Sequence, residues 1–289
     1  MKAPSPPPPL RGTSPTRGEE KDAVERTLVR RGDIAVLEVL AQGPAKAPLV
    51  VLLPSLGRGA EDFDPIAEAL AAARLRVLRP QPRGIGHSHG CAYQDLEDCA
   101  EDIAAVIEGD GGRPAFLAGH AFGNRVSRLL ATDRPDLVAA VSLIAANVGH
   151  APSPPQVRAA IRNSANPELP REERLEALRF AFFAPGNDAE AWLEGWYPHA
   201  LAHQRVAGDR TPRTRDYAGG GKPILYLQPI HDPLAHVEDA ETFRRENGSR
   251  VKVVIVPNAS HAAIAEQPDF IARELIAYAA QVWPGMRIG

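Results

Sequence analysis

Residues 119–123 (Gly-His-Ala-Phe-Gly) have the spacing of the G-x-S-x-G turn that presents a catalytic serine, but alanine stands at its centre. The preceding residues 114–118 are a strand-like apolar run, and residues 125–132 have a helical pattern. The strand, turn and helix that such a motif requires are therefore expected, without the nucleophile. Any chemistry at Ala121 must avoid a covalent bond to that side chain.

The elements that would position this turn alternate along the chain. Strand-like runs at 24–30, 34–40, 49–53, 75–78, 138–145, 223–227 and 251–256 are interleaved with helical patterns at 62–73, 96–107, 236–246 and 264–282. Such alternation predicts an α/β fold with a mostly parallel sheet and helices on both faces. Residues 151–220 interrupt it with a Pro-rich helical block, which we expect to cover the carboxyl edge of the sheet, where ligands bind.

Composition excludes several classes of function. Of the 289 residues, 44% are hydrophobic and 24% are charged, and the net charge of -3 gives no reason to expect nucleic acid or an anionic membrane as partner. No apolar run approaches the ~20 residues that span a bilayer. The chain has two cysteines, Cys91 and Cys99, which suggest no disulfide framework. We therefore expect a cytoplasmic protein whose partner is a small molecule; the sequence does not indicate its oligomeric state.

The first 22 residues include four consecutive prolines and no apolar core of a signal peptide. They are expected to form a disordered arm. A role as a polyproline ligand is the weaker alternative.

Five motifs in a fixed order carry a resemblance to a known family. They are Leu-Pro-Ser-Leu-Gly at 53–57, Arg-Gly-Ile-Gly-His-Ser at 83–88, the turn at 119–123, Ile-His-Asp-Pro at 230–233 and Asn-Ala-Ser-His at 258–261. Together they resemble the α/β-hydrolase superfamily over residues 24–278. The resemblance implies one core built from residues 23–147 and 221–289, with a helical lid at 148–220.

The resemblance also implies the site. Asp232 would be the acid and His261 the base, because an acceptor on the imidazole Nδ1 proton fixes the tautomer and stabilises the imidazolium. The oxyanion hole would use the backbone N–H groups of Leu56 and Phe122. The alternative is that Asp232 caps a turn and His261 caps the following helix.

Three interpretations of Ala121 remain open. It is an engineered replacement of serine, or a natural residue in a site where His261 acts on a water or a substrate proton, or a mark of a binding protein that has lost turnover. The missing hydroxyl leaves room for about one water. Three further departures from the family pattern, at Pro54, Gln81 and Asn124, favour a natural branch over one engineered change.

Other side chains could serve the pocket. Ser55, His120, Trp196 and His199 are the candidates for its lining, and Trp196, His199 and His203 have the spacing of one helix face. Ser55, Ser88, Cys91 and His120 are weak substitutes for the nucleophile. We expect no metal site at His199 and His203, because no third ligand is evident, and no cofactor, because no phosphate-binding fingerprint opens a helix.

These observations predict an α/β-hydrolase-fold enzyme of the hydrolase class (EC 3 type). The substrate would be a small ester, thioester or amide, or a compound with a cleavable C–C bond. The alternatives are a non-hydrolytic acid-base enzyme, such as a lyase or isomerase, and a catalytically silent ligand-binding protein.

Overall fold

A twisted mixed sheet organises the molecule in the computed structural model, which describes residues 24–149 and 154–285. The strand order is β1-β2-β4-β3-β6-β7-β8-β9, and β5 pairs with β2. Strand β2 is antiparallel to β1, β4 and β5, whereas all pairs from β4 to β9 are parallel. The predicted arm at residues 1–22 lies outside the described residues.

The strands are short and mostly buried. They are β1 Glu25–Arg31, β2 Ala35–Gln42, β3 Leu49–Leu53, β4 Arg76–Pro80, β5 His89–Gly90, β6 Ala115–His120, β7 Val138–Ile144, β8 Ile224–Pro229 and β9 Val251–Val256. The sequence did not indicate β5, a two-residue strand.

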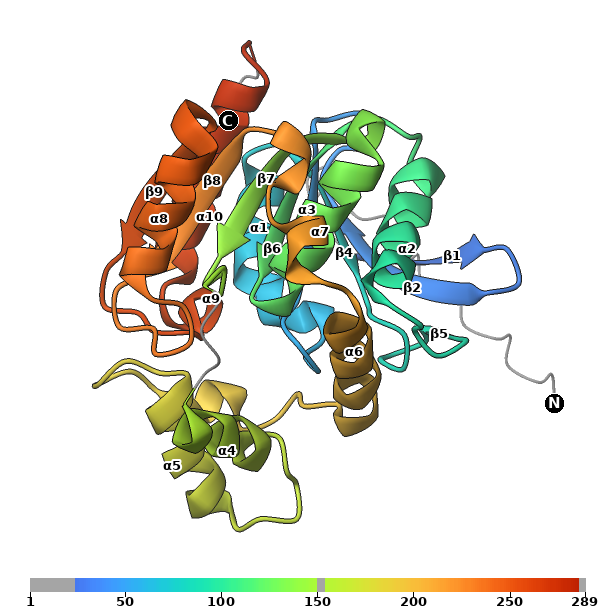
Figure 1. The fold of residues 1–289 in the computed structure, drawn as a ribbon. Coiled ribbons are helices and arrows are strands. Elements are labelled where there is room, and N and C mark those ends of the chain that lie inside the picture. The colour runs from blue at the N-terminus through green and yellow to red at the C-terminus, as the bar shows by residue number, and fades with distance from the viewer. Residues whose placement is uncertain (1–23, 150–153, 286–289) are drawn as a thin grey trace, which may run out of the picture.

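Helices flank both faces of the sheet (Figure 1). The α-helices of the described residues are α1 Asp64–Ala72, α2 Leu96–Gly109, α3 Phe122–Asp133, α4 Pro155–Ser164, α5 Arg171–Ala181, α6 Pro198–Arg210, α7 Arg213–Asp216, α8 Val237–Asn247, α9 Ala263–Glu266 and α10 Pro268–Val282, of which α4 to α7 belong to the segment between β7 and β8. Short 3-10 helices are η2 Ala60–Phe63, η3 Pro135–Leu137, η4 Ala189–Trp192, η5 Gly219–Gly221 and η6 Gly248–Arg250.

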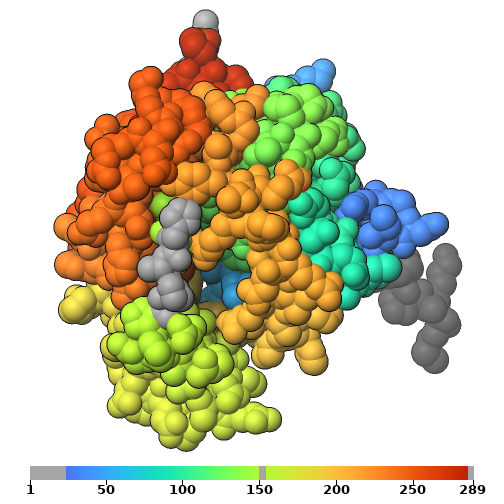
Figure 2. All heavy atoms as spheres, in the orientation of Figure 1, coloured from blue at the N-terminus to red at the C-terminus, as the bar shows by residue number. Residues whose placement is uncertain are grey.

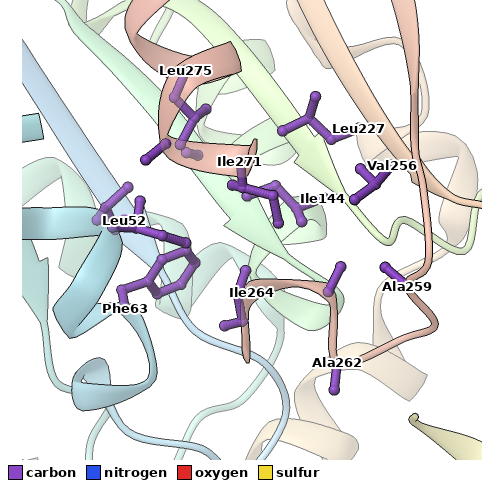
Figure 3. Packing of buried hydrophobic residues seen from close by; sticks show 14 of the residues in the cluster. Leu52, Phe63, Ile144, Leu227, Val256, Ala259, Ala262, Ile264, Ile271 and Leu275 are labelled. Carbon is purple, nitrogen blue, oxygen red and sulfur yellow. The ribbon is translucent and has the colours of Figure 1, made fainter. Parts of the chain in front are cut away.

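The continuous apolar run of β3 feeds two cores, because successive side chains point to opposite faces of the sheet. Val50 and Leu52 pack with α1 and α10, whereas Val51 and Leu53 pack with α2 and α3. Figure 3 shows the first of these cores, in which Leu52 and Phe63 belong to the same cluster as Ile271 and Leu275. Strand β3 is therefore buried on both of its faces.

The segment between β7 and β8 is helical wherever it is regular, and we call residues 155–221 the helical insert. Helices α4 and α5 form a lobe beyond the carboxyl ends of the strands, and α6 stands apart from it (Figure 1). Buried side chains of this lobe, among them Leu178 and Trp192, are continuous with the α1/α10 core. The insert is therefore packed onto the sheet rather than tethered beside it.

Two predicted helices are wrong in detail. The pattern at 264–282 is split into α9 and α10, because Pro268 lacks the N–H that would continue a helix and instead begins α10. The pattern at 62–73 begins as a 3-10 turn, η2, and becomes α-helical only at Asp64. Both segments nevertheless bury an apolar face, with Ile66 and Leu70 in the first and Ile271 and Leu275 in the second.

Candidate functional site

The turn from β6 to α3 holds Ala121 in a strained backbone conformation. Its φ of 48° and ψ of -107° are unusual for a residue with a side chain. A Cβ on Gly119 would lie 2.4 Å from the backbone N of Asn124, and one on Gly123 would lie 2.3 Å from the backbone O of Leu53. Glycine is therefore required on both sides of Ala121, which explains the spacing of the motif.

Asn124, one of the departures from the family pattern, anchors this turn. Its side-chain amide donates to the backbone O of Ala121, and its Oδ1 accepts a 3.0 Å hydrogen bond from Arg128. Arg128 in turn lies 3.3 Å from Asp216 of the helical insert, which also receives a hydrogen bond from Arg125. The residue at 124 thus belongs to a buried polar network that links the turn to the insert.

Asp232 and His261 meet at the ends of two adjacent strands. Asp232 follows β8, His261 follows β9, and the two strands pair in parallel. Asp232 Oδ2 lies 2.8 Å from His261 Nδ1, and Oδ1 accepts the backbone N–H groups of Leu234 and Ala235. Both side chains are buried. With its lone pairs used in this way, the carboxylate fixes the ring of His261 and favours a proton on Nδ1, which leaves Nε2 as the basic nitrogen.

His120 lies beneath His261. Its Nε2 donates to the backbone O of His261 at 2.7 Å, whereas its buried Nδ1 has no hydrogen-bond partner among the described residues. Burial, together with the nearby charge of His261, lowers the pKa of His120 to about 3. His120 is therefore a neutral supporting residue that positions the loop carrying His261.

Two backbone N–H groups remain without acceptors beside Ala121. Those of Leu56 and Phe122 donate to no acceptor within the described part of the chain. The next N–H along, that of Gly57, donates to Gln204 Oε1 of α6 at 2.7 Å. The loop after β3 is thus held by the insert, and two donors are left available to an oxyanion.

A cavity of about 480 Å³ opens over these groups. Figure 2 shows the surface hollowed between the α4/α5 lobe and α6. The lining residues that come from the sheet edge are Ser55, Leu56, Ala121, Phe122, Asn124, Arg125, Asn147, Leu234 and His261. Those from the insert are Arg158, Ile161, Arg162, Phe182, Trp196, Leu201, Gln204, Arg205, Gly208, Asp209 and Arg213. The volume is in the range that holds a small organic ligand.

The candidate pocket residues divide into two groups. Ser55 and Trp196 line the cavity, whereas His120 lies below it and His199 is exposed on α6. The expectation that Trp196, His199 and His203 share one helix face is wrong, because α6 begins only at Pro198. Trp196 precedes the helix and its ring packs on Trp192 and Phe182.

Ser88 and Cys91, two of the weak candidates for a replacement nucleophile, do not line the cavity. Ser88 Oγ donates to the backbone O of Gln81 and accepts the backbone N–H of Glu38, which identifies it as a structural residue. Cys91 is exposed and does not line the cavity.

Sequence reasoning missed Arg58, which joins the loop after β3 to the insert. Its buried guanidinium lies 4.7 Å from the ring centroid of Trp192 and 4.9 Å from that of Trp196, and it donates to both carboxylate oxygens of Asp62. It also donates to the backbone O of Glu194. No local signal separates such an arginine from a solvated one, because its partners in the insert, Trp192, Glu194 and Trp196, lie more than 130 positions away.

Metal ligands do not gather in the part of the chain that the structure describes: no three His, Cys, Asp or Glu side chains are close enough to hold an ion. In the same residues, no helix has the length and apolar content to cross a bilayer.

Comparisons with known proteins agree with this architecture. The model of the "Alpha/beta hydrolase family" matches residues 50–274. Rhodomycin D methylesterase DauP of Streptomyces sp. (strain C5) is 23% identical, over 86% of this chain and 92% of its own. The sn-1-specific diacylglycerol lipase ABHD11 of Mus musculus is 31% identical over 34% of this chain and 33% of its own. Four curated relatives match over only 33% to 57% of their own length.

Among solved structures, a thermophilic esterase from Thermogutta terrifontis has a TM-score of 0.73 at 20% identity, covering 89% of this chain and 99% of its own. At that identity the likeness shows the fold alone. The family model covers well over half of the chain, so the predicted α/β-hydrolase fold is confirmed, and the chain belongs to the alpha/beta hydrolase family.

Proposed function

We propose that this protein is an enzyme that acts on a small organic substrate with His261 as general base. The observation that carries the proposal is the 2.8 Å contact between Asp232 and His261, both buried, beside a cavity that also contains Ala121. Hydrolase relatives, including a methylesterase and a lipase, support an ester or a related acyl compound as substrate.

Because Ala121 has no hydroxyl, the proposed hydrolysis has no acyl-enzyme intermediate. A water held near His261 Nε2 loses its proton to that nitrogen as its oxygen adds to the substrate carbonyl. The carbonyl oxygen becomes an oxyanion, which the N–H groups of Leu56 and Phe122 receive. Collapse expels the leaving group, to which His261 returns the proton. In the non-hydrolytic alternative, the same nitrogen removes a proton from the substrate itself.

The polar network around Asn124 supports Ala121 as a natural residue. Asn124 is matched by Arg128 and Asp216, and Gln81 is matched by the backbone N–H of Ala60 and the carboxylate of Glu61. One engineered substitution would not create these partners. Codon 121 of the source gene tests this directly: a serine codon there would contradict it.

The variant Ala121→Ser tests whether the site is otherwise intact. The strained turn and the Asp232–His261 pair would activate the new hydroxyl, so we expect labelling by a fluorophosphonate and a burst with p-nitrophenyl esters. The double variant Ala121→Ser/His261→Ala should lose both signals. A single variant with neither burst nor label would contradict an intact site.

Activity of the unaltered protein is tested on a panel of short-chain aryl esters. If His261 is the general base, His261→Ala should lower turnover by about 10²- to 10⁴-fold. His199→Ala is the matched control, because His199 is an exposed histidine outside the cavity. Equal activity of both variants would overturn the proposal, and a binding role without turnover would then fit better.

A further inference from the structure

The wall of the cavity is unbalanced in charge. Five arginines line it, Arg125, Arg158, Arg162, Arg205 and Arg213, against one carboxylate, Asp209. They come from four helices, α3, α4, α6 and α7, so the fold and not one local run gathers them. An excess of one sign inside a concave site concentrates ligands of the opposite sign.

Two of these arginines are already engaged. Arg125 donates to Asp216 and to the backbone O atoms of Gly208 and Thr211. Arg213 donates to the backbone O of Asn147 at 3.0 Å. Burial and the charge of Arg125 lower the pKa of Arg213, although Asp216 opposes this. These two side chains brace the inner wall, and their positive charge is only partly balanced.

The outer wall offers guanidinium groups to a ligand. Among the described residues, no carboxylate lies within ion-pair distance of Arg162 or Arg205, and Asp209, one turn after Arg205, pairs with neither. Arg158 and Arg162 are four positions apart on α4 and so share a face, where like charges repel.

The floor of the cavity is more apolar than its arginine-lined wall. His261 and Ala121 lie there with Phe182, Trp196 and Leu234, which give it an apolar surface. A ligand that filled the cavity would therefore place an apolar portion near His261 and a negative group toward α4 and α6.

We propose that the substrate carries an anionic group, a carboxylate or a phosphate, that binds between Arg162 and Arg205, while its reacting carbon lies at His261. This rests on the proposed use of the cavity as the active site. Arginine suits this role because its planar fork donates two parallel hydrogen bonds to such an oxyanion.

Calorimetric titration of the unaltered protein tests the proposal with three probes of similar shape: 4-phenylbutyrate, its neutral amide 4-phenylbutanamide, and 3-phenylpropyl phosphate. Charge-assisted hydrogen bonds should make the better anion bind at least about tenfold more tightly than the amide. This preference should weaken as salt is added. Tighter binding of the phosphate or of the carboxylate identifies which anion the substrate carries.

The double variant Arg162→Gln/Arg205→Gln should bring the affinities of anion and amide close together. Arg245→Gln is the control, because Arg245 is an exposed arginine on α8 outside the cavity. Equal binding of anion and amide, an unchanged preference in the double variant, or no binding of any probe would overturn the proposal. An anion preference in a protein whose turnover is independent of His261 would instead overturn the proposed function and leave only the anion site between Arg162 and Arg205 standing.

Discussion

Ala121 retains the geometry of a nucleophile position without the nucleophile. A backbone conformation of this kind costs about 1 to 3 kcal/mol and persists only where its surroundings enforce it. Here the backbone N–H of Ala121 donates to Ile144 at 3.0 Å, and Asn124 binds the carbonyl through both its backbone and side-chain nitrogens. The turn is therefore maintained by partners other than a serine hydroxyl, which fits a site that uses the shape of the turn to place the Phe122 N–H.

At the same scale, His120 makes stability depend on pH. Its folded pKa of about 3 lies below the ordinary value of 6.5, so the unfolded chain binds an extra proton between these values. Stability contributed by neutral His120 is thus complete above pH 6.5 and is lost as the pH falls toward 3. The difference between 6.5 and about 3 corresponds to about 5 kcal/mol at the acid end.

The variant His120→Gln keeps a donor for the backbone O of His261 and removes the titratable imidazole. Urea unfolding at pH 7 and pH 4 should show a smaller loss of stability on acidification than in the unaltered protein. His199→Gln, at an exposed histidine, should leave the loss unchanged. If His120→Gln loses as much stability between pH 7 and pH 4 as the unaltered protein does, His120 is not the group that makes stability depend on pH.

At the scale of elements, the approach of α3 to β3 depends on Gly123. A methyl group there would lie 2.3 Å from the backbone O of Leu53, and backbone cannot move aside cheaply. We expect Gly123→Ala to lower the free energy of unfolding by about 1 to 3 kcal/mol, the usual cost of overpacking. Chemical denaturation with circular dichroism measures it.

The control for this change is Gly109→Ala in α2. There a Cβ would meet only Val29 side-chain atoms at 3.5 Å, an ordinary contact. Alanine favours a helix over glycine by up to about 1 kcal/mol, so this variant should be neutral or more stable. Equal destabilisation by both changes would show that the close approach of α3 is not the cause.

The elements themselves were largely predictable, because apolar runs buried on both faces leave a strong pattern. Strands β3 and β9 have the predicted bounds, and the mostly parallel pairing follows from the alternation of strands and helices. The break between α9 and α10 was missed because the apolar spacing continues across Pro268. The position of Trp196 was missed for a similar reason: residue spacing alone does not show that Pro198 begins the helix.

For the whole molecule, the candidate site was predictable only where it depends on strand order. Asp232 and His261 follow neighbouring strands, so their meeting follows from topology. The arginine-lined wall does not, because it depends on how α4 and α6 are placed relative to the sheet edge. Residue spacing within the insert contains no information about that placement.

The connection between sheet and insert depends on Arg58, whose side chain packs against Trp192 and Trp196 of the insert and pairs with Asp62 of the core. The variant Arg58→Met keeps much of the apolar stem but removes the cation–π contacts, and it leaves the mostly buried carboxylate of Asp62 unpaired. Breaking one partner of a buried ion pair costs about 3 to 5 kcal/mol, so the unfolding midpoint should fall steeply. Trypsin should then cut within residues 155–210 before it cuts the sheet, because the insert loses its attachment first.

Arg179→Met, at an exposed arginine of α5, should alter neither measurement, because surface ion pairs contribute little. The variant Arg58→Met/Asp62→Asn, which no longer buries an unpaired charge, should recover part of the loss. If it recovers nothing, the contacts with Trp192 and Trp196, and not the ion pair, hold the insert over the site.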